Sequence, residues 1–161
     1  HMIAIMLEEL KLCHGMSVLE IGTGSGYNAA LMSEILKAGS SGSDSGVVVT
    51  IERVVELRKF AFDNLKRTNY SDFVEIVIGD GTLGYPERCE EKIYDRIIVT
   101  AASPNIPRFL LSQLRTGGIL LVPVGGPRSQ DLEKIEKHSN GQISRKTICG
   151  CMFVPLIGDE N

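Results

Sequence analysis

The clearest indication of the fold is the stretch Val18-Leu19-Glu20-Ile21-Gly22-Thr23-Gly24-Ser25-Gly26-Tyr27. In it a short apolar run passes directly into a loop in which every second residue is glycine. We predict a buried strand over Ser17–Ile21 and a helix over Tyr27–Lys37. Glycine lets the backbone turn tightly and lets a ligand touch the main chain. This order is typical of the first strand–helix unit of a doubly wound sheet.

Outward from this stretch, strand-like and helix-like segments alternate along the chain. Helical spacing covers Ile3–Leu12, Arg53–Arg67 and Ile106–Leu114. The alternation predicts a parallel sheet with right-handed crossovers. Before the second strand, 39–46 has seven Gly or Ser among eight residues, which predicts a flexible surface loop. The further predicted strands are Val47–Glu52, Phe73–Ile78, Tyr94–Ala101 and Ile119–Val124.

The pattern changes near the C-terminus. Asp131–Lys137 and Gln142–Val154 flank Asn140-Gly141, a strong hairpin signal. We therefore predict an α/β fold with a doubly wound, mostly parallel sheet, Rossmann-like in class, that ends in an antiparallel strand pair. The length of 161 residues fits one domain over 1–161.

Composition and charge exclude several classes of protein. The 17 basic and 20 acidic residues give a net charge of −3, so nucleic acid is not the expected partner. No apolar run approaches the roughly 20 residues of a membrane span, and the start, with Glu8 and Glu9, is no basic leader. The cysteines and histidines have no metal-site spacing, so no metal is expected. Cys13, Cys89, Cys149 and Cys151 are predicted to be small buried residues in a reducing compartment, the cytoplasm.

Besides Glu20 in the first strand, two acidic residues lie at the ends of predicted strands. Glu52 ends the second strand, where a carboxylate can bind both hydroxyls of a ribose; the alternative is an acid that stabilises a helix start. Asp80 lies between Gly79 and Gly81, placed to accept a hydrogen bond from an adenine amino group. The alternative for Asp80 is an ordinary Asp-Gly turn.

The charges favour one class of cofactor. The loop lacks the third glycine of the dinucleotide fingerprint, since Tyr27 stands there, and no lysine follows it as in a phosphate-binding loop. Glu20, Glu52 and Asp80 would surround the pocket and repel a pyrophosphate. S-adenosylmethionine carries a sulfonium and an ammonium, so its charges match these acids, and we favour it over NAD.

The fourth predicted strand ends in small residues, Thr100-Ala101-Ala102-Ser103, followed by Pro104. This segment should face the transferred methyl group, and small side chains leave room for a substrate backbone. A plain turn into the next helix is the alternative.

The chain resembles the protein-L-isoaspartate O-methyltransferase family. The resemblance extends from His1 to about Gly158 and begins with the 18–27 block, which is generic to class I methyltransferases. The more specific blocks are Gly79-Asp80-Gly81 with Gly84-Tyr85, 94–101 with Ala102, Gln113-Leu114-Arg115-Thr116-Gly117-Gly118, Val122-Pro123-Val124-Gly125 and Phe153-Val154-Pro155-Leu156.

The resemblance implies methyl transfer from S-adenosylmethionine to the α-carboxylate of L-isoaspartyl residues in damaged proteins and peptides, by a monomer that needs neither nucleic acid nor membrane. It implies cofactor binding by nine residues: Glu20, Gly22, Thr23, Gly24, Ser25, Gly26, Glu52, Asp80 and Gly81. For the substrate it implies His1, Thr100, Ala101, Ala102 and Val124, with the flanking Val122–Val124 and Val154–Leu156 segments as further candidates.

Family members also carry an N-terminal region that ends in a motif like Ser-x-Pro-His-Met, and His1-Met2 stand where that motif ends. The resemblance implies that this region orients the isoaspartyl residue and covers the cofactor. The family's Ser or Thr has no counterpart in this sequence, so the catalytic residue stays unknown. We expect the 161-residue chain to bind S-adenosylhomocysteine weakly and to methylate slowly.

Two alternatives stay open at this point. One is a methyltransferase for another carboxylate, in a peptide or a small acid. The other is a truncated cofactor-binding module without turnover.

Overall fold

A single seven-stranded sheet organises the chain in the computed structural model, which describes residues 1–38 and 46–160. Most of the predicted loop over 39–46 lies outside the described residues. The strand order is β3-β2-β1-β4-β5-β6-β7. The first five are parallel, and β6 runs antiparallel to both of its neighbours. The strands are β1 Ser17–Ile21, β2 Val47–Glu52, β3 Val74–Ile78, β4 Tyr94–Val99, β5 Leu114–Gly126, β6 Ser129–Lys137 and β7 Ile143–Cys151.

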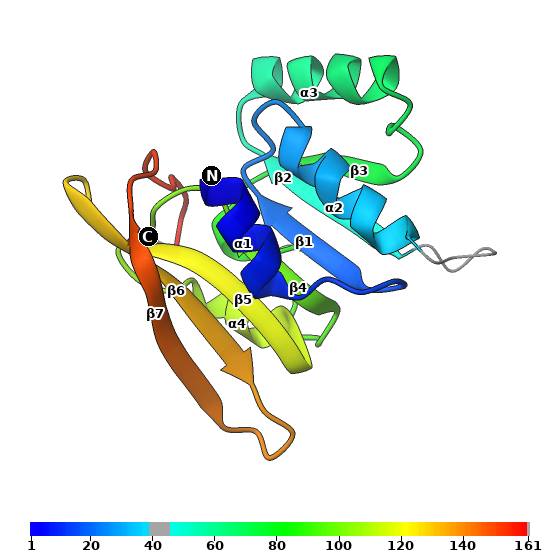
Figure 1. Cartoon of the computed structure of the whole chain (residues 1–161). Helices are drawn as coiled ribbons and strands as arrows, with labels where there is room; N and C mark the ends of the chain where they lie inside the picture. The colour runs from blue at the N-terminus through cyan, green and yellow to red at the C-terminus, as the bar shows by residue number, and fades with distance from the viewer. Residues whose placement is uncertain (39–45, 161) are drawn as a thin grey trace.

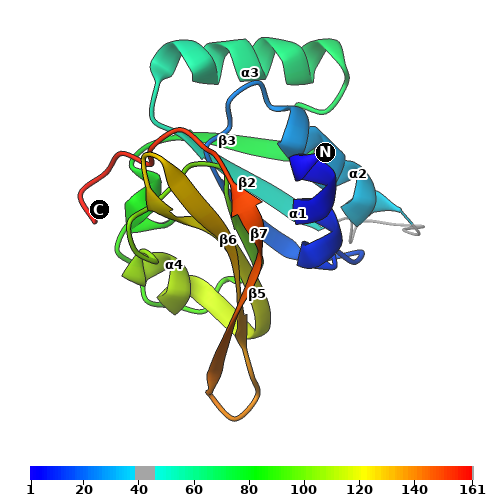
Figure 2. The same ribbon diagram turned by 60° about the vertical axis from the view of Figure 1, so that its left-hand side comes forward.

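Helices cover the two faces of the sheet unequally (Figures 1 and 2). Three helices pack on one face, and a short one packs on the other together with a 3₁₀ turn. None of the helices in the described ranges is long and apolar enough to cross a bilayer. They are α1 Met2–Leu10, α2 Tyr27–Lys37 and α3 Val55–Arg67 on the first face, then the 3₁₀ turn η1 Gly81–Leu83 and α4 Arg108–Gln113.

Alternating strand residues build two cores, one on each face. Val18 packs with Met32 of α2 on the first face, whereas its neighbour Leu19 packs with Leu110 of α4 on the second. Successive side chains of a strand point to opposite faces, so a strand buried on both sides reads as a continuous apolar run. This explains why these strands were visible in the sequence.

The sequence placed the boundary between α4 and β5 wrongly. The predicted helix over 106–114 is shortened to Arg108–Gln113, and β5 begins at Leu114, five residues before the predicted Ile119. Gly117 and Gly118 lie within β5. Gly117 has φ +79°, and the pairing of β4 with β5 shifts register between Tyr94 and Arg96. The glycines thus lie in an irregular part of a strand.

The C-terminal part also goes beyond the prediction. The hairpin at Asn140-Gly141 is confirmed, with only Gly141 at positive φ. However, β5 joins β6 in a second antiparallel pairing from Ile119 to Gly126, so the antiparallel region contains three strands rather than a pair. In this sheet β1 lies between β2 and β4, so the order of the strands reverses between β1 and β4. A ligand site is expected at the carboxyl ends of the strands at this point.

Candidate active site

Two adjoining pockets lie at the carboxyl ends of the central strands. One has a volume of about 280 Å³ and the other about 340 Å³, and both are lined by Gly22, Gly24 and Thr100. The first continues past Ile51 and Glu52 toward Gly79 and Gly81, and its far wall is Val154, Pro155, Leu156 and Ile157. The second continues over Glu20, Thr23, Ser25, Asn28 and Tyr27 to Met2, Ile3, Met6, Met152 and Phe153.

The glycine loop separates the two pockets and is held in one shape. Gly22, Gly24 and Gly26 have φ of +96°, +55° and +80°. A side chain at Gly22 would meet the hydroxyl of Thr100, whereas one at Gly24 would meet nothing within 4 Å. The Thr100 hydroxyl donates to the carbonyl oxygens of Ile21 at 3.0 Å and Gly22 at 2.8 Å. The loop is therefore rigid, and its backbone faces open space at Gly24.

Gly26 has a different position from the other loop glycines. It is the residue before α2, and a side chain there would meet Leu65 and Ala61 of α3. Gly26 therefore lets α2 and α3 approach, and it lines neither of the two pockets.

Glu52 connects the loop to the start of α3. Its Oε2 accepts the N–H of Gly24 at 3.0 Å, and its Oε1 accepts the N–H groups of Arg53 at 2.9 Å and Val54 at 3.0 Å. Glu52 thus stabilises the start of α3, and its side chain also lines the first pocket. A carboxylate has about four acceptor sites, so about one is left, on Oε2, for a ligand hydroxyl.

Glu20 lies fully buried beneath the loop. Its carboxyl accepts Nδ2–H of Asn28 and the hydroxyl of Thr50, each at 2.7 Å, and the Thr50 hydroxyl lies 2.7 Å from that of Thr23. Burial raises the pKa of Glu20 to about 7, against hydrogen bonds from Thr50 and Asn28 that favour the charged form. Glu20 therefore does not carry a full negative charge near neutral pH, and the pocket has fewer than the three full charges expected from the sequence.

Asn28 adds an acceptor that the sequence did not predict. It is 8% exposed, and its Oδ1 is buried without a hydrogen-bond partner in the described part of the chain. Buried polar atoms are nearly always paired, so an unpaired acceptor beside a carboxylate fits a ligand with a cationic N–H donor. No local pattern in the sequence marks Asn28, because its place depends on how α2 packs over β1.

Asp80 and Gly81 take different positions at the pocket edge. Gly81 lines the pocket, and a side chain there would overlap Ile21. Asp80 is not among the lining residues. Its Oδ1 accepts the N–H and hydroxyl of Thr82 at 2.9 and 2.7 Å, and its Oδ2 accepts the N–H of Asp159 at 2.7 Å. Burial alone would raise the pKa of Asp80, but these bonds and the charge of Arg53 outweigh it and lower the pKa.

The residues predicted to meet the substrate do not all gather in one place. Thr100 and Ala101 line the first pocket, and Ala102 lines a neighbouring pocket of about 210 Å³. Val124 pairs with Ser103, and their chain neighbours Gly125 and Ala102 line that pocket. His1 lines none of these three pockets. Its substrate role is therefore not supported by its position here.

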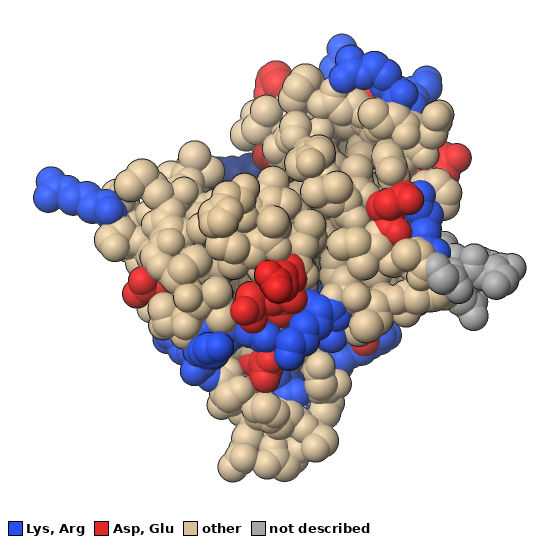
Figure 3. Space-filling view, in the orientation of Figure 1, with Lys and Arg blue, Asp and Glu red and all other residues tan. Residues whose placement is uncertain are grey.

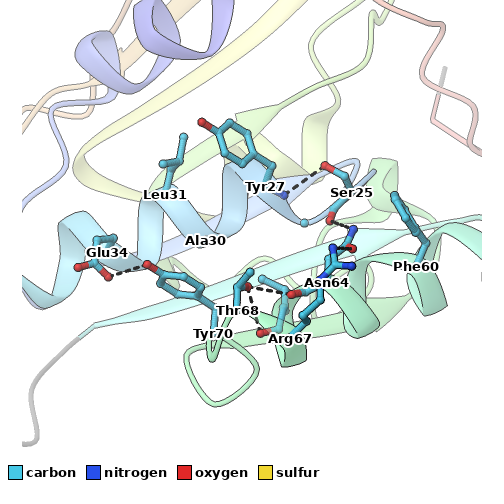
Figure 4. A pocket seen from close by; sticks show the side chains of 12 residues that line it. Ser25, Tyr27, Ala30, Leu31, Glu34, Phe60, Asn64, Arg67, Thr68 and Tyr70 are labelled. Carbon is cyan, nitrogen blue, oxygen red and sulfur yellow. Dashed lines mark hydrogen bonds between the residues drawn. The ribbon is translucent and has the colours of Figure 1, made fainter.

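A larger pocket of about 640 Å³ lies between α2 and α3 and reaches the glycine loop only at Ser25 and Gly26 (Figure 4). Its polar groups largely bond one another: Tyr70 donates to Glu34 at 3.1 Å, and Asn64 donates to the carbonyl oxygen of Ser25 at 3.0 Å. The rest of its surface is mostly apolar. It offers no pair of acids for a cationic ligand, so the two pockets at the glycine loop remain the candidate active site.

Known proteins resemble this chain over its whole length. The family model described as protein-L-isoaspartate(D-aspartate) O-methyltransferase matches residues 1–161. Relatives named protein-L-isoaspartate O-methyltransferase from Methanopyrus kandleri and Staphylothermus marinus are 49% and 50% identical over 99% of the chain. The chain covers 67% and 69% of these relatives, about two thirds of their length.

Solved structures agree with the sequence comparison. A Plasmodium falciparum protein described as a protein-L-isoaspartate O-methyltransferase, in complex with S-adenosyl-L-homocysteine, superposes with a TM-score of 0.84 at 27% identity. The match covers 100% of this chain and 74% of that protein. A second structure of the same description gives a TM-score of 0.83 at 31% identity, over 99% of this chain and 47% of that one.

Proposed function

The chain belongs to the protein-L-isoaspartate(D-aspartate) O-methyltransferase family, and on this premise we propose that the protein transfers the methyl group of S-adenosylmethionine to the α-carboxylate of L-isoaspartyl residues in damaged proteins. The observation that carries the proposal is the pair of pockets on either side of the glycine loop, with Glu52 in one and Glu20 in the other.

The donors and acceptors of the two pockets fit this cofactor. Glu52 offers an acceptor to a ribose hydroxyl, and the apolar side chains of Ile51 and Leu57 line the same pocket, where they could pack on a base. On the other side of the loop, Glu20 and the unpaired Asn28 Oδ1 suit the ammonium of the methionine part. The open face of Gly24 lets the ligand lie against the backbone between them.

The site needs to do little acid–base chemistry. S-adenosylmethionine supplies an activated methyl group on a sulfonium. The substrate carboxylate, with a pKa of about 4, is already ionised near neutral pH, so it needs no general base. The small side chains of Ala101 and Ala102 leave space for the substrate. Orientation of the carboxylate against the methyl group then supplies most of the rate enhancement.

We extend the proposal to the protein's surroundings. A single domain over 1–161 is supported by the one continuous sheet with a core on each face. Basic and acidic side chains are interspersed on the face shown in Figure 3, which supports a protein without a nucleic-acid or membrane partner. The four cysteines form no disulfide, which supports a reducing compartment, the cytoplasm. The prediction that they are buried was wrong, since Cys13 is exposed and the other three are half-buried. We also propose a monomer, which size-exclusion chromatography with light scattering tests.

Methyl transfer to paired peptides tests the proposed function. Labelled methyl groups from S-adenosylmethionine should reach an L-isoaspartyl peptide and not its normal aspartyl twin. Since the chain spans about two thirds of its relatives, the assay uses both this chain and the full product of its gene. Equal labelling of the two peptides, or preferred labelling of another acid in a panel, would contradict the proposed substrate.

A further inference from the structure

Residues 154–160, the C-terminal segment, form one wall of the first pocket and are attached at two places. The inner half continues the sheet: Ala102 N–H donates to the carbonyl oxygen of Val154, and Leu156 N–H donates to that of Ala102, both at 2.8 Å. Leu156 also packs on the core of the second face. Figure 2 shows the segment, in red, leaving β7 and running to the C-terminus. The inner half is therefore firmly anchored.

The outer half docks on Asp80. The N–H of Asp159 donates to Asp80 Oδ2 at 2.7 Å, and the N–H of Glu160 donates to the Thr82 hydroxyl at 3.2 Å. Gly158 packs so closely that a side chain there would overlap the carboxylate of Asp80 and the side chain of Thr82. A residue at the edge of the pocket thus holds a segment 79 positions away in sequence.

Two exposed ion pairs complete the attachment of the outer half. Arg88 lies 3.5 Å from Asp159, and Arg108 approaches Glu160 with two nitrogens, at 3.1 and 3.2 Å. Arg88, Asp159 and Arg108 have side chains 59%, 71% and 70% exposed, whereas Glu160 is 27% exposed. Exposed ion pairs stabilise little and weaken as salt increases. The outer half is thus held by two backbone hydrogen bonds to side chains and by these ion pairs, whereas the inner half is held by sheet hydrogen bonds and core packing.

We propose that Ile157–Glu160 form a latch over the cofactor pocket, which lifts from Asp80 to exchange the cofactor and closes again on it. Asp80 is then a positioning residue that acts by holding the latch. The hinge falls after Leu156, where sheet hydrogen bonds and core packing end. Ile157 lines the pocket together with Glu52, Val54 and Leu57, so lifting it opens this pocket. The inference rests on the proposed function, because it assigns the pocket to the cofactor.

Gly158→Ala tests the latch without touching the pocket lining. The added methyl group displaces the segment from Asp80 and Thr82. Gly150→Ala is the matched control, because a side chain there meets nothing within 4 Å. With S-adenosylhomocysteine as the probe, surface plasmon resonance should show dissociation about tenfold faster for Gly158→Ala, as expected for loss of one hydrogen bond to a charged group. The control should match the unchanged chain.

A second pair of variants separates the latch from direct binding by Asp80. Asp80→Asn should speed dissociation similarly, and the double variant with Gly158→Ala should be no faster than either alone, since both act on one contact. The Asp159→Asn, Glu160→Gln chain keeps both backbone donors but loses the ion pairs. It should dissociate about threefold faster and lose the dependence of this rate on salt.

Hydrogen exchange supplies a readout independent of ligand. Amides of residues 157–160 should exchange faster in Gly158→Ala than in the Gly150→Ala control, with 152–156 unchanged. Equal dissociation rates for Gly158→Ala and its control, or rates that multiply in the double variant with Asp80→Asn, would overturn the latch. Failure of the unchanged chain to bind S-adenosylhomocysteine would instead overturn the proposed function.

Discussion

Replacement of Glu52 by alanine tests the assignment of the first pocket. The variant loses the acceptor that we assign to a ribose hydroxyl, and also the bond that fixes Gly24 of the loop. A hydrogen bond to a charged group is worth about 1.5–3 kcal/mol, and about 1.4 kcal/mol corresponds to tenfold in affinity. The dissociation constant for S-adenosylhomocysteine, measured by titration calorimetry, should therefore rise about 10- to 100-fold.

The fold should survive this change. The N–H groups of Arg53 and Val54, which also lose their acceptor, belong to exposed residues at the start of α3, where water can replace the carboxylate. We expect a loss of about 1–2 kcal/mol in unfolding free energy. Glu56→Ala is the matched control, since it removes an exposed acid from the first turn of the same helix. An affinity of Glu52→Ala equal to that of this control would refute the assignment.

Three further predictions concern buried polar groups. Binding of S-adenosylhomocysteine near pH 7 should release protons, because its ammonium lowers the pKa of Glu20 from about 7. Calorimetry in buffers of different ionisation enthalpy measures the number of protons released. If none are released, the ammonium does not lie beside Glu20. Without ligand, stability should fall as pH rises from about 4.5 to about 7, because native Glu20 keeps its proton where the unfolded chain, with the ordinary value of 4.5, releases it. Urea unfolding of Glu20→Gln should lack this part of the slope. Arg96→Met should lower the unfolding free energy by about 2–4 kcal/mol, because the carbonyl oxygens of Leu10 and Asp95 lose a charged donor. Arg58→Met, which changes an exposed arginine, is the control. Equal melting temperatures of the two variants would contradict a stabilising role of Arg96.

Local sequence signals predicted the first half of the fold well. β1, α2 and β2 begin and end at the predicted residues, because each is bounded by glycines or by a charged residue after a short apolar run. The start of β5 was missed because Leu114 belongs to an apolar helical pattern, and only its pairing with Tyr94 makes it a strand. Pairing across the sheet is not encoded in local periodicity.

The candidate site was predictable in place but not in detail. The carboxyl ends of parallel strands meet at one edge, so the sequence could bring Glu20, Glu52 and Gly81 together. It could not show that Asp80 turns toward Asp159, since that contact depends on the path of the chain after β7. Nor could it show that Glu20 is fully buried, which depends on how α2 covers β1.

Amide hydrogen exchange, measured with and without S-adenosylhomocysteine, tests where the cofactor binds. We predict slower exchange at 21–24, at 52–54, at 79–82 and in 154–160, with no change around Phe60 and Tyr70 of the α2–α3 pocket. Protection of the α2–α3 pocket, with residues 21–24 unchanged, would place the ligand elsewhere and refute this location.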